Sequence, residues 1–288
     1  MIEGLIEARV RELQPANAVE QENAVQEIMQ AFVLASLARC GFFSQAAFQG
    51  GTCLHMLYGM RRFSEDLDFL LRKADPRFRW EPCLRAVQED CAQQNIRFEV
   101  QDRSRAGAAV RAAFLKTDSI GKVLQLDLPF SRQTSRRIKI KLEIDTNAPA
   151  GSACETKYLT FPVVSAITTQ TLECGFATKS HALLCRPYVK GRDWYDFVWY
   201  VGRCTPLSYR LLANALRQVG PWAGRPTKVT RQWYLDAMRA RIGRIDWRQA
   251  RADVARFVPA PEQEGLRAWN AAFFSHLLDQ LAAYLPER

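Results

Sequence analysis

Long apolar runs are missing from this chain of 288 residues. A helix that crosses a membrane needs about 20 consecutive apolar residues, and the longest candidate, residues 31–40, is interrupted by Arg39. The first residues also lack the basic flank and the apolar stretch of a secretory signal peptide. We therefore predict a protein that makes no membrane contact and is cytoplasmic.

Closely spaced cysteines are missing as well. The eight cysteines stand at positions 40, 53, 83, 91, 154, 174, 185 and 204, and none of them forms a Cys-x-x-Cys pair. That spacing argues against a zinc knuckle, and without export a disulfide framework is not expected either. We expect the thiols to pack as small apolar side chains. His55 and His181 lack metal-binding spacing, so we expect them to be packed or hydrogen-bonded.

Lysine is scarce, with nine among the 40 basic residues, so arginine dominates. The formal net charge of +10 is concentrated late in the chain: residues 181–288 hold 17 basic and 9 acidic residues, and residues 1–180 hold 23 and 21. The planar guanidinium suits phosphate, so a basic lobe beside a nearly neutral one favours a polyanionic partner such as nucleic acid. A solvated basic helical surface would give the same count.

The remaining composition, 48% hydrophobic and 24% charged, is that of a soluble globular protein. Apolar periodicity predicts helices at 21–39, 53–58, 80–95, 165–174, 177–187, 193–203, 207–219, 230–243, 247–257 and 262–285. Alternation predicts strands at 66–71, 97–101, 110–115, 123–128 and 137–145. These elements predict an α+β fold, with a mixed α/β core over residues 1–160 and a helical basic lobe over residues 161–288.

Two carboxylates, Asp66 and Asp68, stand two residues apart on the predicted strand 66–71. Residues i and i+2 of a strand point to the same side, so both carboxylates can bind one cation or bridge two. Two like charges so close are costly without a metal ion between them. Metal ions neutralise the triphosphate in phosphoryl-type transfer, so the pair predicts a catalytic metal site, although an isolated Asp-x-Asp is more often solvated surface.

A glycine turn precedes this strand. Gly50 and Gly51 permit close backbone approach, and the short helix after Thr52 offers free N–H groups to a phosphate. A simple tight turn before a helix is the alternative. The order of glycine pair, short helix, Arg-Phe-Ser and Asp-x-Asp is a more specific sign of a phosphate and metal site than the glycine turn or the Asp-x-Asp pair alone.

A third carboxylate and a cation complete the candidate site. Asp145 and Glu143 lie on one face of the predicted strand 137–145, and the residues alone do not decide between them. Lys179 lies inside an apolar helix, where a cation favours an anionic partner such as a triphosphate. A lysine that extends from the helix edge to solvent is the alternative.

Four segments resemble motifs of the AbiEii/AbiGii toxin family, the nucleotidyltransferase toxins of type IV toxin–antitoxin systems, which are related to the MenT toxins. The segments are residues 49–68, 139–145, 179–186 and 191–197. They follow the expected order, which makes the match specific, whereas the region beyond about residue 205 shares only helical character. The resemblance implies a polymerase-β-like nucleotidyltransferase fold: a mixed sheet with helices, followed by a helical lobe.

The resemblance also implies roles for individual residues. Asp66 and Asp68 would bind two Mg²⁺ ions, with Asp145 or its alternative Glu143 as the third metal ligand, and either Asp193 or Asp196 would complete the catalytic set. The residues that would hold the NTP are Gly50, Gly51, Thr52, Arg62, Ser64, Lys179 and Arg186. Arg186 and Arg192 could instead pair with the two aspartates. Thr52 stands where the family often has serine, and the hydroxyl is retained.

The resemblance therefore implies transfer of a nucleoside monophosphate from an NTP to the 3′ end of tRNA. A cognate antitoxin, encoded as a separate protein, would be the partner. Two alternatives remain open: a small-molecule or protein hydroxyl as the acceptor, and a non-catalytic nucleotide- or RNA-binding module.

Overall fold

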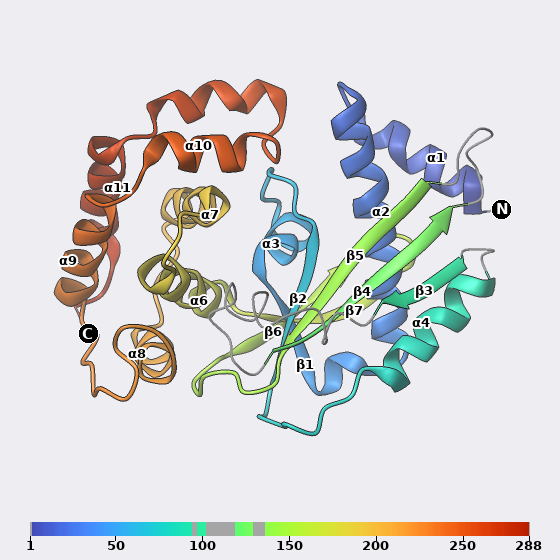
Figure 1. Cartoon of the computed structure of the whole chain (residues 1–288), viewed down its shortest axis with the longest axis horizontal. Helices are drawn as coiled ribbons and strands as arrows, with labels where there is room; N and C mark the ends of the chain where they lie inside the picture. Colours follow the sequence, from blue (N-terminus) through green and yellow to red (C-terminus); the bar gives the residue numbers. More distant parts are fainter. Residues whose placement is uncertain (1, 94–96, 102–118, 129–135, 288) are drawn as a thin grey trace.

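The computed structural model describes residues 2–93, 97–101, 119–128 and 136–287 (Figure 1). The first lobe contains α1 (Ile2–Leu13), α2 (Ala18–Arg39), the 3-10 helix η1 (Phe42–Ser44), β1 (Ala46–Gln49), α3 (Gly50–Tyr58), β2 (Asp66–Leu71), α4 (Glu81–Gln93), β3 (Arg97–Gln101), β4 (Ser119–Leu128), β5 (Arg136–Asp145), β6 (Cys154–Leu159) and β7 (Ser165–Gln170). The second lobe contains α6 (Leu172–Cys185), α7 (Gly191–Gly202), α8 (Tyr209–Gln218), α9 (Arg231–Ile242), α10 (Trp247–Ala255), the 3-10 helix η2 (Ala260–Ala268) and α11 (Ala271–Tyr284).

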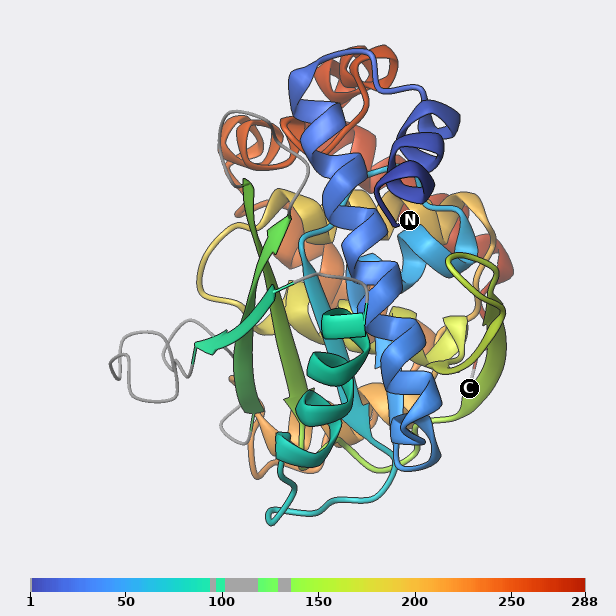
Figure 2. The same cartoon turned by 90° about the vertical axis from the view of Figure 1, so that its right-hand side faces the viewer.

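Seven strands form one mixed sheet in the order β3-β4-β5-β2-β1-β7-β6. β2 and β5 run parallel, as do β1 and β7, whereas the other neighbours are antiparallel. Figure 2 shows α2 and α4 crossing the sheet on one face, and Figure 1 shows the helical lobe on the other side. The α+β fold predicted from the sequence is confirmed.

Alternation along β2 and β5 decides which face carries polar residues. Leu67 and Phe69 on β2, like the isoleucines of β5, belong to the core beneath α2 and α4. Successive side chains of a strand point to opposite faces. Asp66, Asp68 and Glu143 therefore face the helical lobe, where they line a cavity.

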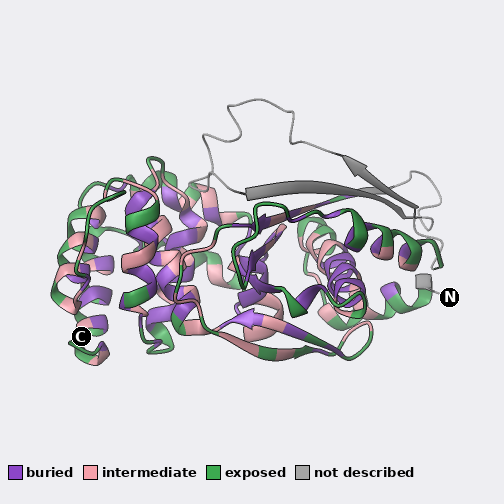
Figure 3. Cartoon of the chain, turned by 90° about the horizontal axis from the view of Figure 1, so that it is seen from below, coloured by how far each residue is buried: buried purple, intermediate pink, exposed green. Residues whose placement is uncertain are grey.

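Each lobe has its own hydrophobic core. The core of the first lobe joins α1, α2 and α4 to the sheet, and that of the second lobe joins α6 to α11. Figure 3 shows buried residues gathered both around the sheet and inside the helical bundle. Leu54 and Met60, from the first lobe, belong to the second core. The lobes therefore share apolar packing beside α3.

Two of the predicted helices are wrong in extent. Residues 165–170 form strand β7, and Thr171 then caps α6 by accepting a hydrogen bond from the Cys174 N–H. β-Branched Ile167, Thr168 and Thr169 suit a strand better than a helix. The predicted helix 262–285 is divided, because η2 ends at Ala268 and Asn270 caps α11.

Other sequence predictions have mixed outcomes. The sequence patterns missed α1, β1 and β6, and the predicted strand 110–115 lies outside the described residues. The division into domains at residue 160 stays a prediction, although β7 extends the sheet to Gln170. No helix in the described ranges is both long and apolar enough to cross a membrane.

Most of the cysteines pack as the sequence predicted, but Cys40 and Cys204 are exposed. All eight are free thiols, and five of them are buried: Cys53, Cys83, Cys91, Cys174 and Cys185. Burial raises the pKa of Cys83, Cys91 and Cys185 to about 12. These thiols are therefore protonated and unreactive at neutral pH.

Candidate active site

The carboxylates of β2 and β5 form one row on the sheet face that meets the helical lobe. In the parallel pairing of these strands, Asp68 lies opposite Glu143, and Leu70 lies opposite Asp145. Glu143 is thus the acid directly beside Asp68, and Asp145 stands one row further along. The register favours Glu143 as the third acid of a metal site, a choice that the sequence left open.

Burial and mutual repulsion disfavour the charged forms of these acids. Burial, followed by the nearby charge of Asp68, raises the pKa of Asp66 above its usual range. The same two causes raise the pKa of Glu143, and Lys141 opposes them from 2.6 Å (Nζ to Oε1). A divalent cation between the carboxylates would offset this repulsion.

The donor chemistry therefore fits Mg²⁺, which prefers carboxylate oxygens. As the side chains lie, no three Asp, Glu, His or Cys residues among those described converge closely enough to hold an ion. Asp66 and Asp68 supply the pair, and Glu143 or Asp145 would have to turn toward them to complete the set.

The glycine turn packs directly against this acidic row. Gly50 begins α3 with a left-handed φ of +80°, and a Cβ there would lie 2.6 Å from Oδ2 of Asp68. A Cβ on Gly51 would lie 2.4 Å from Nη2 of Arg62. Both glycines line the cavity. Only glycine permits this approach of the α3 N-terminus to the acids, and the free N–H groups there favour an anion.

Gly50→Ala is expected to lower the catalytic rate by at least about 10²-fold, because the new methyl group displaces the Asp68 carboxylate that charge stabilisation requires. Gly41→Ala is the matched control. Gly41 has a similar φ of +77°, and nothing lies within 4 Å of a Cβ there. Both variants should lose about 1–2 kcal/mol of stability from left-handed strain. Steady-state rates and thermal unfolding measure the two effects, and equal rates for the variants would contradict the prediction.

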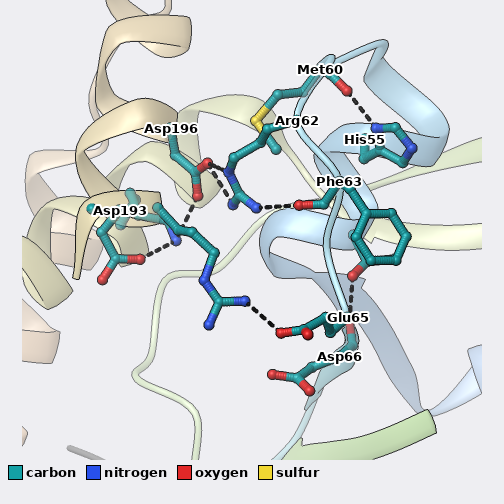
Figure 4. Close-up of polar contacts among 12 residues, drawn as sticks. His55, Met60, Arg62, Phe63, Glu65, Asp66, Asp193 and Asp196 are labelled. Carbon is teal, nitrogen blue, oxygen red and sulfur yellow. Dashed lines mark hydrogen bonds and ion pairs between the residues drawn. The ribbon is translucent and has the colours of Figure 1, made fainter. Parts of the chain in front are cut away.

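The loop between α3 and β2 is held by the helical lobe. Arg62, only 2% exposed, donates from Nε to Oδ1 of the fully buried Asp196 at 2.6 Å (Figure 4). The Phe63 N–H donates to the Phe257 carbonyl at 2.8 Å. Arg62 lines the cavity, yet its guanidinium is paired with Asp196. Its first role is therefore to join the two lobes.

A compact cluster of ion pairs surrounds Lys179. Its Nζ lies 2.7 Å from Asp193 Oδ1 and 2.8 Å from Asp196 Oδ2, and Arg186 Nη1 lies 3.1 Å from Asp193 Oδ2. Burial alone would lower the pKa of Lys179, but the two carboxylates raise it above its usual value. Burial alone would raise the pKa of Asp193, but Lys179, Arg186 and Lys190 hold it well below its usual range. Lys179 and Asp193 are therefore both charged at neutral pH.

The two aspartates of α7 differ in position. Asp193 lines the cavity together with Lys179 and Arg186, whereas Asp196 lies behind them against Arg62. The sequence could not separate these residues. The geometry gives Asp193 the position beside a ligand and Asp196 a supporting one.

A cavity of about 160 Å³, here called the charged cavity, lies between the lobes. Carboxylates line its sheet side: Asp66, Asp68, Glu143 and Asp145. Cations line its helical side: Lys179, Arg186, Lys190 and Arg192. Such a two-sided cavity can hold divalent cations on one wall and phosphates on the other.

The structure brings most of the predicted residues to this cavity, and the exceptions are Asp196, which lies behind the cavity, and Thr52. Ser64 lines the cavity, but Thr52 is fully buried, and its hydroxyl donates to the Asp66 carbonyl beneath the cavity wall. Lys190 was missed, although a lysine directly before the fourth motif was visible in the sequence. His55 bonds Glu27 and the Met60 carbonyl, and His181 bonds the Val219 carbonyl, as hydrogen-bonded histidines.

Residues 33–274 match the family model described as nucleotidyl transferase AbiEii toxin, type IV TA system. The chain belongs to the AbiEii family. The resemblance drawn from the four motifs is therefore confirmed, and the protein is a nucleotidyltransferase toxin of a type IV toxin–antitoxin system.

A solved structure shares the fold of this AbiEii chain. JHP933 from Helicobacter pylori superposes with a TM-score of 0.52 at 16% identity, over 91% of this chain and 90% of that chain. A second H. pylori chain, provisionally assigned as a nucleotidyltransferase, has a TM-score of 0.48 at 16% identity, over 89% of this chain and 90% of that chain. No curated protein sequence matches the chain.

Proposed function

We propose that this AbiEii protein uses Mg²⁺ to transfer a nucleoside monophosphate from an NTP to the 3′ end of tRNA. One observation carries the proposal: a single cavity joins a carboxylate wall on β2 and β5 to a cationic wall on α6, α7 and the connection between them. A triphosphate with bound metal needs both kinds of wall at once.

The cationic wall binds the triphosphate, and the carboxylate wall binds the metal ions. Lys179, Arg186 and Lys190 neutralise the triphosphate, and the N–H groups at the start of α3 bind its oxygens. Asp66 and Asp68, with Glu143 or Asp145, hold the divalent cations, which when bound neutralise charge on the reacting phosphates. Asp193 keeps Lys179 and Arg186 charged and directed toward the cavity.

The transfer itself is a displacement at the α-phosphorus. The acceptor hydroxyl oxygen forms a bond to that phosphorus, and the bond from the phosphorus to the bridging oxygen of the β-phosphate breaks. Pyrophosphate leaves with that oxygen, and the hydroxyl proton passes to a carboxylate of the acidic wall. Positioning by the two walls supplies most of the rate enhancement in this class of reaction.

The helical lobe supports RNA as the acceptor. Residues 181–288 carry 17 basic and 9 acidic residues. Exposed cations of this lobe include Arg210 and Arg217 on α8 and Arg225 in the loop that follows. Phosphate contacts of this kind bind RNA without requiring a particular sequence. A cognate antitoxin is the expected protein partner of a type IV toxin.

The test incubates the protein with Mg²⁺, total tRNA and each α-labelled NTP in turn, beside Asp68→Ala and an EDTA control. Label should appear on the 3′ end of tRNA with a preferred NTP and disappear in both controls. Binding of tRNA should weaken steeply between 50 and 200 mM salt, by roughly 10³-fold or more if six or more phosphates are contacted. Label on a small molecule or on protein, with none on tRNA, would reject the acceptor proposed here.

A further inference from the structure

A second, smaller cavity of about 60 Å³ adjoins the charged cavity; it is here called the neutral cavity. Its walls come from the ends of β1 and β7 and from α6, α8 and the segment after β5. Both cavities are lined by Gln49, Asp145, Gln170, Thr178 and His181. The two cavities therefore meet along this shared wall.

The chemistry of the two cavities differs sharply. Among the described residues that line the neutral cavity, Asp145 and His181 are the only ionisable ones, and both are shared with the charged cavity. Its remaining wall is apolar or neutral, as at Leu70, Pro149 and Leu211. This wall offers a phosphate no favourable electrostatic interaction. It offers an uncharged, flat and partly polar group both apolar contact and hydrogen bonds.

Two buried amides stand where the cavities meet. Gln49 and Gln170 directly follow Phe48 and Thr169, which pair across the parallel strands β1 and β7. They are 6% and 4% exposed. Gln49 donates from Nε2 to the Phe69 carbonyl at 3.2 Å. Within the described part of the chain, this bond uses one of its N–H groups and leaves the other for a ligand.

The side chain of Gln170 is held in place by two hydroxyl groups. Its Nε2 lies 2.9 Å from Ser152 Oγ, and its Oε1 lies 3.2 Å from Thr178 Oγ1. Thr178 Oγ1 also lies 3.2 Å from the Cys174 carbonyl, and a hydroxyl can donate or accept, so these contacts hold the Gln170 amide in place without deciding which end donates. An amide held at this position can offer both a donor and an acceptor to a ligand.

We propose that the neutral cavity holds the nucleoside half of the NTP, and that Gln49 and Gln170 contact its base or ribose. This inference rests on the proposed function, since the triphosphate must occupy the charged cavity. In an NTP only the ribose separates the base from the phosphates. The nucleoside and the triphosphate therefore need adjoining sites, the first uncharged and the second charged. The RNA backbone is a poorer occupant, because each of its nucleotides carries a phosphate that would meet Asp145 and, among the described residues of this wall, no lysine or arginine.

The test compares binding of each NTP with binding of inorganic triphosphate, measured calorimetrically with Mg²⁺ and without any acceptor. The wild-type protein should bind its preferred NTP at least about tenfold more tightly than inorganic triphosphate. This difference in affinity is the contribution of base contacts and hydrogen bonds. Ala148→Trp, on the shared wall of the neutral cavity and an outer groove, should remove that difference and leave triphosphate affinity unchanged. Ala92→Trp, on the exposed side of α4, is the matched control and should bind both ligands as the wild type does.

Gln170→Leu gives an independent result, because it retains the side-chain volume and removes the amide. It should reduce the preference among the four NTPs to less than about threefold. If Ala148→Trp binds NTP normally but no longer labels tRNA, the neutral cavity holds the acceptor and the inference is overturned. If the wild type binds neither NTP nor triphosphate, the proposed function fails and this inference fails with it.

Discussion

Asp68→Asn is expected to slow nucleotidyl transfer by at least about 10³-fold, the scale on which removal of one charge-stabilising group slows phosphoryl transfer. Asp68 lies opposite Glu143 and against the start of α3, at the centre of the acidic wall. Asparagine has nearly the same shape, so packing is kept while the negative charge is lost. The loss should therefore appear in single-turnover rates with labelled NTP and not in the folded structure.

Thermal unfolding of Asp68→Asn distinguishes this loss from misfolding. Burial and, after it, the charge of Asp68 raise the pKa of both Asp66 and Glu143, so removal of that charge relieves repulsion among like charges. The variant should be at least as stable as the wild type in the absence of divalent cation. Asp279→Asn, an exposed acid on α11, is the control and should retain full activity. A rate for Asp68→Asn within tenfold of the wild type would show that Asp68 is not part of the metal site.

Asp196→Ala is expected to destabilise the protein by about 3–5 kcal/mol, the cost of leaving one partner of a buried ion pair uncompensated. Arg62 is 2% exposed and Asp196 is fully buried, so water cannot replace the missing carboxylate. Chemical denaturation of the wild type and the variant measures the difference. Asp193→Ala should cost less stability, because Lys179 and Arg186 reach the cavity and its solvent.

A double variant tests whether the ion pair itself is responsible. Arg62→Met combined with Asp196→Leu replaces the pair by apolar side chains and should recover most of the stability lost by Asp196→Ala. The activity of the double variant should remain low if Arg62 also positions the loop before β2. Wild-type stability of Asp196→Ala alone would refute the structural role assigned to this aspartate.

The strands that carry the acids were predictable because their pattern is local. Alternation of apolar and polar residues along 66–71 and 137–145 gives both the strand and its buried face. The choice between Glu143 and Asp145 was not predictable, because it depends on the register of β2 against β5. Register is set by the packing of the whole sheet and not by either segment alone.

Long-range pairs explain most of what the sequence did not reveal. Arg62 and Asp196 are 134 positions apart, so the motif containing Arg62 suggested phosphate binding instead of a bond between lobes. Thr52 was expected at the phosphates because it follows two glycines, but the approach of α3 to β2 directs its hydroxyl to the Asp66 carbonyl. The strand at 165–170 depends on its neighbours β1 and β6 for pairing, which its own six residues do not indicate.

The division of the charged cavity between two lobes affects the moment at which the toxin becomes active during its own synthesis. A nascent chain that ends before residue 172 contains the acidic wall and none of the cations of α6 and α7. The Phe63 N–H additionally needs Phe257 for its hydrogen bond. Most of the polypeptide must therefore leave the ribosome before the site exists, and premature stop codons throughout the gene should relieve toxicity.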